Sequence, residues 1–285
     1  PADFAGLYRP EWSNALCEKR RELDVLAVGA PALLIDAVVV TVTICGGVLL
    51  GRLLKMDRGI ALLTSVGSGI CGAAAVLGAE STIRARPYKT AVAVSTVVIF
   101  GTISMFLYPV LYRHGIVSLT PEQMGIYTGA TLHEVAHVVG AGNAMNGEIS
   151  DAAIIVKMIR VMMLVPVLLT ISYSVSVARA RRRRLADRRS CGGVTRRIAV
   201  PWFALGFLAV IGFNSFGLLG EATVSFIHSL DTFLLTMAMT ALGAETSIEK
   251  FKKAGAKPFV LSLLLFVWLV GGGWLLVKYM APALM

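Results

Sequence analysis

The sequence predicts an all-helical membrane protein that crosses the bilayer several times, and three observations support this fold class. Hydrophobic residues make up 56% of the 285 residues, which is too apolar for a soluble fold. Charged residues make up only 15%, and they gather between long apolar segments. The segment LGAESTI (residues 77–83) returns as LGAETSI (residues 242–248), in each case at the end of an apolar segment and before basic residues and a proline. This echo indicates an internal duplication, an arrangement found in many membrane transporters.

The distribution of charge divides the chain into four parts. Residues 1–24 form a polar N-terminal segment without the order of charged start, apolar core and cleavage site of a signal peptide. Residues 25–178 and 198–285 hold the membrane helices, and an Arg-rich linker at residues 179–197 separates them. The positive-inside rule keeps this linker in the cytoplasm. Because the net charge of +10 arises largely in short loops beside apolar segments, we expect a lipid bilayer and no nucleic acid as partner.

Several apolar segments reach the roughly 20 residues that span a bilayer. The expected spans are residues 25–50, 60–80, 88–111, 124–145, 151–177, 198–219, 223–244 and 258–279. The first contains a single acid, Asp36. An acid within a membrane span is either a functional carboxylate or the partner of a neighbouring helix, and the sequence leaves both interpretations open.

The second span is unusually rich in small residues. Gly67, Gly69 and Gly72 fall within six residues, with Ser68 and Cys71 between them. Glycine weakens a helix interior, and non-helical backbone within a membrane is tolerated only where it is buried in protein or lines a wet cavity. The alternative is close packing between helices, which small residues also permit. The echo favours a broken helix whose free N–H groups attract anions.

The fourth span contains the motif H-E-x-x-H at His133, Glu134 and His137. On a continuous helix this motif places two imidazoles on one face, as in zinc metalloproteases. No third ligand motif accompanies it, so we favour a polar cluster that lines a path for a substrate or a proton over a metal site or a purely structural cluster. Lys157 and Arg160 share one face of the next span and either snorkel to the surface or point inward.

The topology depends on residues 124–145. If this segment crosses the membrane, the two LGAE copies lie in oppositely oriented spans and form an inverted repeat. If it dips into the membrane and returns, the copies are parallel. The distribution of basic residues slightly favours the dipping arrangement.

Several blocks of the chain closely resemble the YeiH/UPF0324 family of bacterial inner-membrane proteins, which are often labelled sulfate exporters. Among these blocks are GSGICGAAAVLGAE, GIYTGATLHEVAHVVGAGNA, KMIRVMMLVP and LDTFLLTMAMTALG. The resemblance implies two inverted repeats, each with a broken helix that crosses its partner near the middle of the membrane, and so it favours the crossing arrangement. It also implies that about three N-terminal helices of the first repeat are missing. In the family the position of His137 is often Gln, which speaks against a zinc protease.

From the residues and this resemblance we expect a secondary transporter of a small anion, sulfate or an organic sulfonate or carboxylate, working by alternating access. The expected coupling ion is a proton or sodium; we expect no enzyme activity, metal or cofactor, and we regard a homo-oligomer as compatible with the sequence. The expected site residues are Gly67, Ser68, Gly69, Cys71, Gly72, His133, Glu134, His137, Lys157, Arg160, Asn214, Asp231 and Thr232. Lys157 and Arg160 are expected to be counter-charges for the anion. The competing hypotheses are an intramembrane zinc metallopeptidase and a truncated membrane protein that does not transport.

Overall fold

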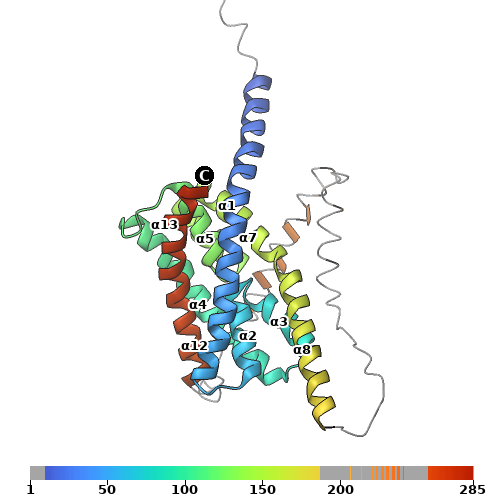
Figure 1. Ribbon diagram of the computed structural model, residues 1–285. Helices are drawn as coiled ribbons and strands as arrows, with labels where there is room; N and C mark the ends of the chain where they lie inside the picture. The colour runs from blue at the N-terminus through green and yellow to red at the C-terminus, as the bar shows by residue number, and fades with distance from the viewer. Residues whose placement is uncertain are drawn as a thin grey trace, which may run out of the picture.

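The computed structural model describes residues 10–186 and 256–284, together with isolated positions between residues 206 and 240. Within these residues every regular element is a helix (Figure 1). The elements are α1 (Pro10–Leu53), α2 (Arg58–Gly69), α3 (Ala73–Ile83), α4 (Pro87–Arg113), α5 (Pro121–Thr131), α6 (Val135–Met145), α7 (Gly147–Met162), α8 (Leu164–Ala186), α12 (Ala256–Val267), the π-helical turn η2 (Trp268–Gly272) and α13 (Gly273–Leu284).

Within the described residues, four segments are long and apolar enough to cross a membrane: Ala32–Leu53, Pro87–Arg113, Gly147–Val177 and Ala256–Ala283. They correspond to four of the predicted spans, so the all-helical, multi-pass class is confirmed. The predicted spans 198–219 and 223–244 lie outside the described residues, apart from isolated positions. The helix α1 runs from Pro10 through the predicted boundary at residue 24, and the first part of the Arg-rich linker continues α8 as far as Ala186.

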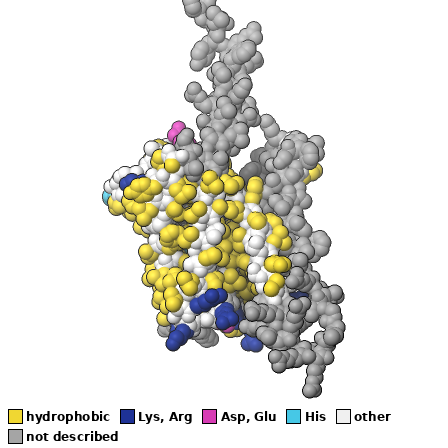
Figure 2. Space-filling model, viewed as in Figure 1, with side chains coloured by type: hydrophobic (Ala, Val, Ile, Leu, Met, Phe, Trp, Pro, Cys, Tyr) yellow, Lys and Arg dark blue, Asp and Glu magenta, His cyan; other side chains and the backbone are white. Residues whose placement is uncertain are grey.

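One end of the helices carries most of the visible basic side chains (Figure 2), and we call it the basic end. The connection between α1 and α2 lies here, and α12 begins here because Leu261 packs against Ala61 near the start of α2. The helix α4 also begins here, since Lys89 Nζ lies 2.7 Å from Asp57 Oδ1. The positive-inside rule assigns this end to the cytoplasm.

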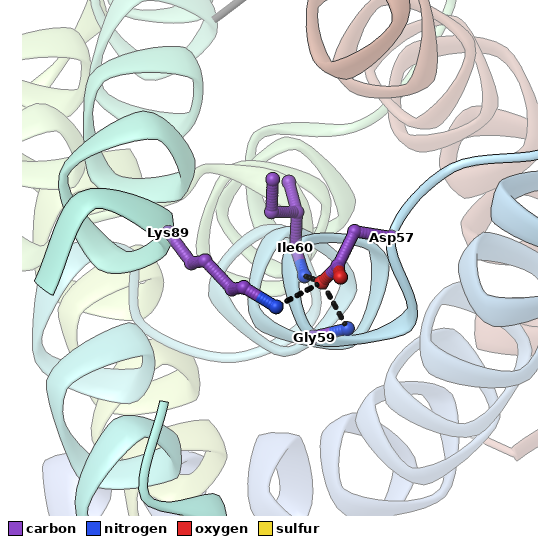
Figure 3. A network of polar contacts seen from close by, with 4 residues as sticks. All are labelled: Asp57, Gly59, Ile60 and Lys89. Atoms are coloured by element: carbon purple, nitrogen blue, oxygen red, sulfur yellow. Dashed lines mark hydrogen bonds and ion pairs between the residues drawn. The ribbon is translucent and has the colours of Figure 1, made fainter. Parts of the chain in front are cut away.

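Asp57 joins these elements (Figure 3). Its carboxylate caps α2 by accepting hydrogen bonds from Gly59 N at 2.8 Å and Ile60 N at 3.2 Å. The same oxygen accepts from Lys89 Nζ on α4, and this hydrogen bond is the main reason why the pKa of Asp57 lies below its usual value. The corner thus fixes the start of α2 against the start of α4.

The predicted break in the Gly-rich span is confirmed, but the chain does not continue across the membrane after it. The helix α2 ends at Gly69, residues 70–72 are not helical, and α3 begins at Ala73. A short connection after α3 leads to α4, whose Lys89 contacts Asp57 at the start of α2. Therefore α3 returns to the basic end, and α2, residues 70–72 and α3 form a re-entrant hairpin, which we call the first hairpin.

The segment with the H-E-x-x-H motif forms a second hairpin. The helix α5 starts at the far end of α4 with a capping box between Thr120 and Gln123. It ends at Thr131, residues 132–134 are extended or irregular, and α6 runs back. Arg113 at the end of α4 donates a 2.7 Å hydrogen bond to Ala144 O near the end of α6, so both arms of the hairpin reach the same end. The second hairpin therefore enters from the side opposite the basic end.

These contacts correct the prediction that residues 124–145 cross the membrane. Both hairpins are built from short helices, of 11 residues in α3, α5 and α6 and 12 in α2. Such helices are about 16–18 Å long, roughly half of a hydrocarbon core of about 30 Å. Their tips therefore lie near the middle of the membrane. The two inverted crossing helices implied by the resemblance are not seen among the described residues, and the echo at residues 242–248 lies outside them.

Small residues hold the second hairpin against α7. A side chain at Gly125 or Gly129 would overlap α7, since a Cβ at Gly125 would lie 2.6 Å from Ala152 Cβ and one at Gly129 2.7 Å from Val156 Cβ. A Cβ at Gly142 on α6 would lie 2.7 Å from Ser150 Cα. Thus α7 lies between both arms of the hairpin and carries Lys157 and Arg160 towards the tips.

Candidate functional site

The tip of the first hairpin depends on Gly72. Its φ of 69° and ψ of −133° lie in a region that residues with a Cβ rarely adopt. As the N-cap of α3, Gly72 also has no side chain with which to bond the first N–H groups of that helix. Those N–H groups must therefore find a partner elsewhere in the protein.

The tip of the second hairpin interrupts the H-E-x-x-H motif. Leu132 and Glu134 have extended backbone, and helix resumes only at Val135. His133 thus lies in the tip, whereas His137 lies in the first turn of α6. The two imidazoles do not share a face of a continuous helix, as the zinc protease arrangement requires. Among the described residues, no group of three His, Cys, Asp or Glu side chains is placed to hold a metal ion.

Glu134 connects the two hairpins. Its position is the N-cap of α6, where an acidic side chain would ordinarily bond its own helix, but no such bond forms. Instead, Glu134 Oε1 accepts a 3.1 Å hydrogen bond from Ala73 N, the first residue of α3 in the other hairpin. The positive ends of two half-helices therefore converge on one carboxylate, which is only 4% exposed.

Lys157 and Arg160 point inward and bind the opposite, negative helix ends. Lys157 Nζ donates to Ile70 O at 2.8 Å and to Leu132 O at 2.6 Å, one carbonyl from each tip. Both cations are fully buried. The terminal carbonyls of a helix have no partner within the helix, and the membrane interior offers no water to replace one. Lys157 therefore stabilises the non-helical backbone of both tips.

Arg160 does the same with more donors. Its Nε donates to Gly69 O at 2.9 Å, and its Nη2 donates to the same oxygen at 2.6 Å and to Ser68 O at 3.4 Å. Its Nη1 donates to Ala130 O and to Leu132 O. The inward orientation was predicted, but the hydrogen bonds of both cations go to main-chain carbonyls and not to Glu134. Their role as direct counter-charges for an anion stays a prediction.

Unpaired polar atoms surround the tips. Buried polar groups in folded proteins almost always have a hydrogen-bond partner, so a cluster without one needs an explanation such as water or a ligand. His137 has a distant neighbour, with Thr102 Oγ1 3.5 Å from its Nε2. The buried atoms at or near the tips with no partner among the described residues are Asp36 Oδ1 and Oδ2, Ser68 Oγ, His133 Nδ1 and Nε2, Glu134 Oε2 and His137 Nδ1.

The structure thus brings most of the predicted site residues together. Gly67, Ser68 and Gly69 form the last turn of α2, Cys71 and Gly72 lie in the first tip, and His133 and Glu134 lie in the second. Asn214, Asp231 and Thr232 lie outside the described residues. The prediction missed four main-chain groups, Ala73 N, Ile70 O, Ala130 O and Leu132 O, because the sequence does not show where a helix end meets a distant side chain.

Asp36 belongs to the surroundings of the site. The sequence singled it out as a lone acid, and the structure buries it completely on α1. Arg160 and Lys157 are the charged groups that act on it electrostatically. Two buried cations and two buried carboxylates, Asp36 and Glu134, therefore occupy the centre of the described part of the protein.

Comparison with known proteins agrees with the membrane architecture. A family model described as conserved hypothetical protein 698 matches residues 22–262. A UPF0324 membrane protein of Bacteroides thetaiotaomicron is 73% identical over 262 residues, which cover 92% of this chain and 76% of the relative. A UPF0324 membrane protein of Bordetella bronchiseptica is 49% identical, over 90% of this chain and 77% of the relative.

The UPF0324 inner membrane protein YeiH of Escherichia coli is 45% identical, over 88% of this chain and 69% of the relative. No solved structure matches the chain. The names of the relatives and the four apolar helices together confirm the predicted membrane location. The chain belongs to the UPF0324 family of membrane proteins.

Proposed function

We propose that the protein is a secondary transporter of a small anion, such as sulfate or an organic sulfonate or carboxylate, in the bacterial inner membrane. One observation carries the proposal: two hairpins from opposite sides of the membrane meet tip to tip, and the N-terminal ends of α3 and α6 converge on one buried carboxylate. Non-helical backbone in the middle of a membrane is tolerated only where it is buried in protein or lines a water-filled cavity, and the polar atoms without a partner among the described residues at the tips favour a cavity for a polar solute. Helix N-termini suit an anion because their free N–H groups and dipole favour negative charge.

The position of the tips supports alternating access. The half-helices reach only about half-way through the membrane, so a solute at their tips is near the midplane. The solute and its water can bind the polar atoms that have no partner among the described residues, which are Ser68 Oγ, both ring nitrogens of His133 and His137 Nδ1. Movement of an anion past such groups needs no covalent step, and we therefore assign no enzyme activity.

Flux measurements test the proposal. The purified chain is reconstituted into proteoliposomes, and uptake of radiolabelled sulfate, a sulfonate and a dicarboxylate is measured against empty liposomes. We expect saturable flux of at least one anion, which excess unlabelled anion suppresses and Gly72→Ala reduces. The absence of flux for every small anion, with correctly folded protein in the liposomes, would exclude the transport role.

A further inference from the structure

We infer that the carboxylate of Glu134 is a tethered substitute for the transported anion, which must be protonated and displaced before the anion binds, so that one proton is taken up with each anion. The inference rests on the proposed function and adds to it the identity of the coupling ion and the residue that carries it.

Glu134 occupies the N-terminal end of α3. The helix α3 begins without a side-chain cap, because Gly72 has no side chain. The first free N–H of the helix, that of Ala73, donates a hydrogen bond to Oε1 of Glu134, which lies 61 positions further along the chain. A carboxylate oxygen at a helix N-terminus sits where an oxygen of sulfate or of a substrate carboxylate would sit, since all of them are anionic acceptors of backbone N–H groups.

Only one of the two carboxylate oxygens of Glu134 has a hydrogen-bond partner among the described residues. Its other oxygen, Oε2, is buried without a hydrogen-bond partner among the described residues. Its neighbour His133 is 1% exposed and has no partner for either ring nitrogen in the same part of the chain. A carboxylate fixed only for structural reasons would be expected to have both oxygens satisfied. The missing hydrogen bonds of one carboxylate oxygen of Glu134 and of the His133 imidazole indicate a site that is arranged for a larger polar ligand.

Charged and titratable groups of two other elements act on Glu134. The groups that interact electrostatically with Glu134 are Lys157 from α7 and Cys71 from the first hairpin. His133 and His137 belong to the same hairpin as Glu134, and Arg160 acts on His133. Both cations are engaged by carbonyls and cannot turn away from the tips. An anion that enters next to an ionised Glu134 would therefore meet a negative charge at the same N–H group. Protonation of the carboxylate removes that charge and frees Ala73 N.

Sulfate and the proton act in the same direction, because each favours the state in which Glu134 has left Ala73 N. When Glu134 is ionised in the free protein, the apparent affinity for sulfate should fall about tenfold for each pH unit of increase, as expected for uptake of one proton per bound anion. The proton comes from water on the side from which the anion enters, and it leaves with the anion.

Sulfate binding to the purified full chain in nanodiscs tests this inference. Affinity is measured by calorimetry between pH 5.5 and 8.0 at constant ionic strength, for the wild type, for Glu134→Gln and for the control Glu122→Gln, which changes an exposed acid in the first turn of α5. We expect binding that weakens with rising pH in the wild type and in Glu122→Gln. We expect binding independent of pH in Glu134→Gln, at least as tight as that of the wild type at pH 5.5.

A second measurement needs no variant. Calorimetry in two buffers with different ionisation enthalpies gives the number of protons taken up, and we expect one per sulfate above pH 7 in the wild type. Wild-type affinity that does not change with pH, no proton uptake, or loss of sulfate binding in a folded Glu134→Gln would each overturn the inference. Sulfate flux without proton linkage leaves the transport role intact, whereas a protein that neither binds nor moves any small anion removes both.

Discussion

The ammonium group of Lys157 gives the sharpest test of how the hairpin tips are held. Lys157→Met keeps a long, flexible, apolar side chain but removes the donor to Ile70 O at 2.8 Å and to Leu132 O at 2.6 Å. Hydrogen bonds to charged groups contribute about 1.5–3 kcal/mol each, so roughly 3–6 kcal/mol is lost. Removal of a buried charge offsets part of this loss, and Leu132 O keeps Arg160 Nη1 at 3.3 Å.

The net effect should be a decrease of about 2–4 kcal/mol in the free energy of unfolding. By the scaling for domains of 150–250 residues, this lowers Tm by roughly 4–16 °C. This decrease in Tm is measured by thermal unfolding in nanodiscs, followed by tryptophan fluorescence. Lys278→Met is a matched control, because Lys278 lies in the last helix with its Nζ 4.8 Å from the centre of the Trp274 ring and should contribute no more than about 1 kcal/mol. Equal Tm values for the two variants would refute this account of the tips.

Three further predictions follow from local geometry. Gly72→Ala should destabilise the protein by about 1–3 kcal/mol and reduce anion flux, because Gly72 has a positive φ and its Cβ would overlap Glu134 Cγ; Gly115→Ala, with φ of 64° and open space around it, measures the strain alone and should leave flux unchanged. Asp57→Asn should cost less than about 1 kcal/mol, because Asn still caps α2 and only the half-exposed pair with Lys89 is lost. Folding lowers the pKa of Asp57, so the stabilisation by its charge is fully present above the unfolded pKa of about 4 and disappears as pH falls through the folded pKa. In thermal unfolding, the difference in Tm between the wild type and Asp57→Asn should therefore decrease only below about pH 4. In variants with a single cysteine, membrane-impermeant thiol reagents should label positions Lys55 and Arg86 from the basic end. The same reagents should label positions Glu122 and Asn146 from the other end, and any other pattern contradicts the hairpins.

The first break could be predicted from the sequence because its cause is local. Gly67, Gly69 and Gly72 weaken the helix where they stand, and the structure ends α2 at Gly69 and places a positive φ at Gly72. The inward orientation of Lys157 and Arg160 was also accessible, since their spacing of three places them on one helix face. Both inferences use only neighbouring residues.

The position of the second break could not be predicted because its cause is distant. Residues 132–134 contain neither Gly nor Pro, and the H-E-x-x-H motif indicates a continuous helix. The helix ends at Thr131 because Lys157 and Arg160, more than 20 residues away, donate hydrogen bonds to the carbonyls of Leu132 and Ala130. Local helix propensity is overridden by that tertiary contact.

The favoured crossing of residues 124–145 was wrong because the family resemblance was given more weight than the basic residues, which slightly favoured the dipping arrangement. The return of the first hairpin was not predicted. Counting each apolar segment as one crossing places the basic residues near Arg58 and those near Arg86 on opposite sides of the membrane. The structure places both at the basic end, because the first hairpin turns back. Hydropathy records the length of an apolar segment but not whether it returns at its middle.

The single ammonium group of Lys157 has a consequence for motion. It bonds one carbonyl of each tip, and α7 carries it, so α7 and the two hairpins are joined where their ends meet. Movement of one tip away from Lys157 would leave the ammonium group and the carbonyl of that tip without a hydrogen-bond partner, in a region without solvent. A change that opens the centre to one face of the membrane and then to the other must therefore shift these three parts together as a rigid carrier against the remaining helices, rather than open one tip while its counterpart stays still.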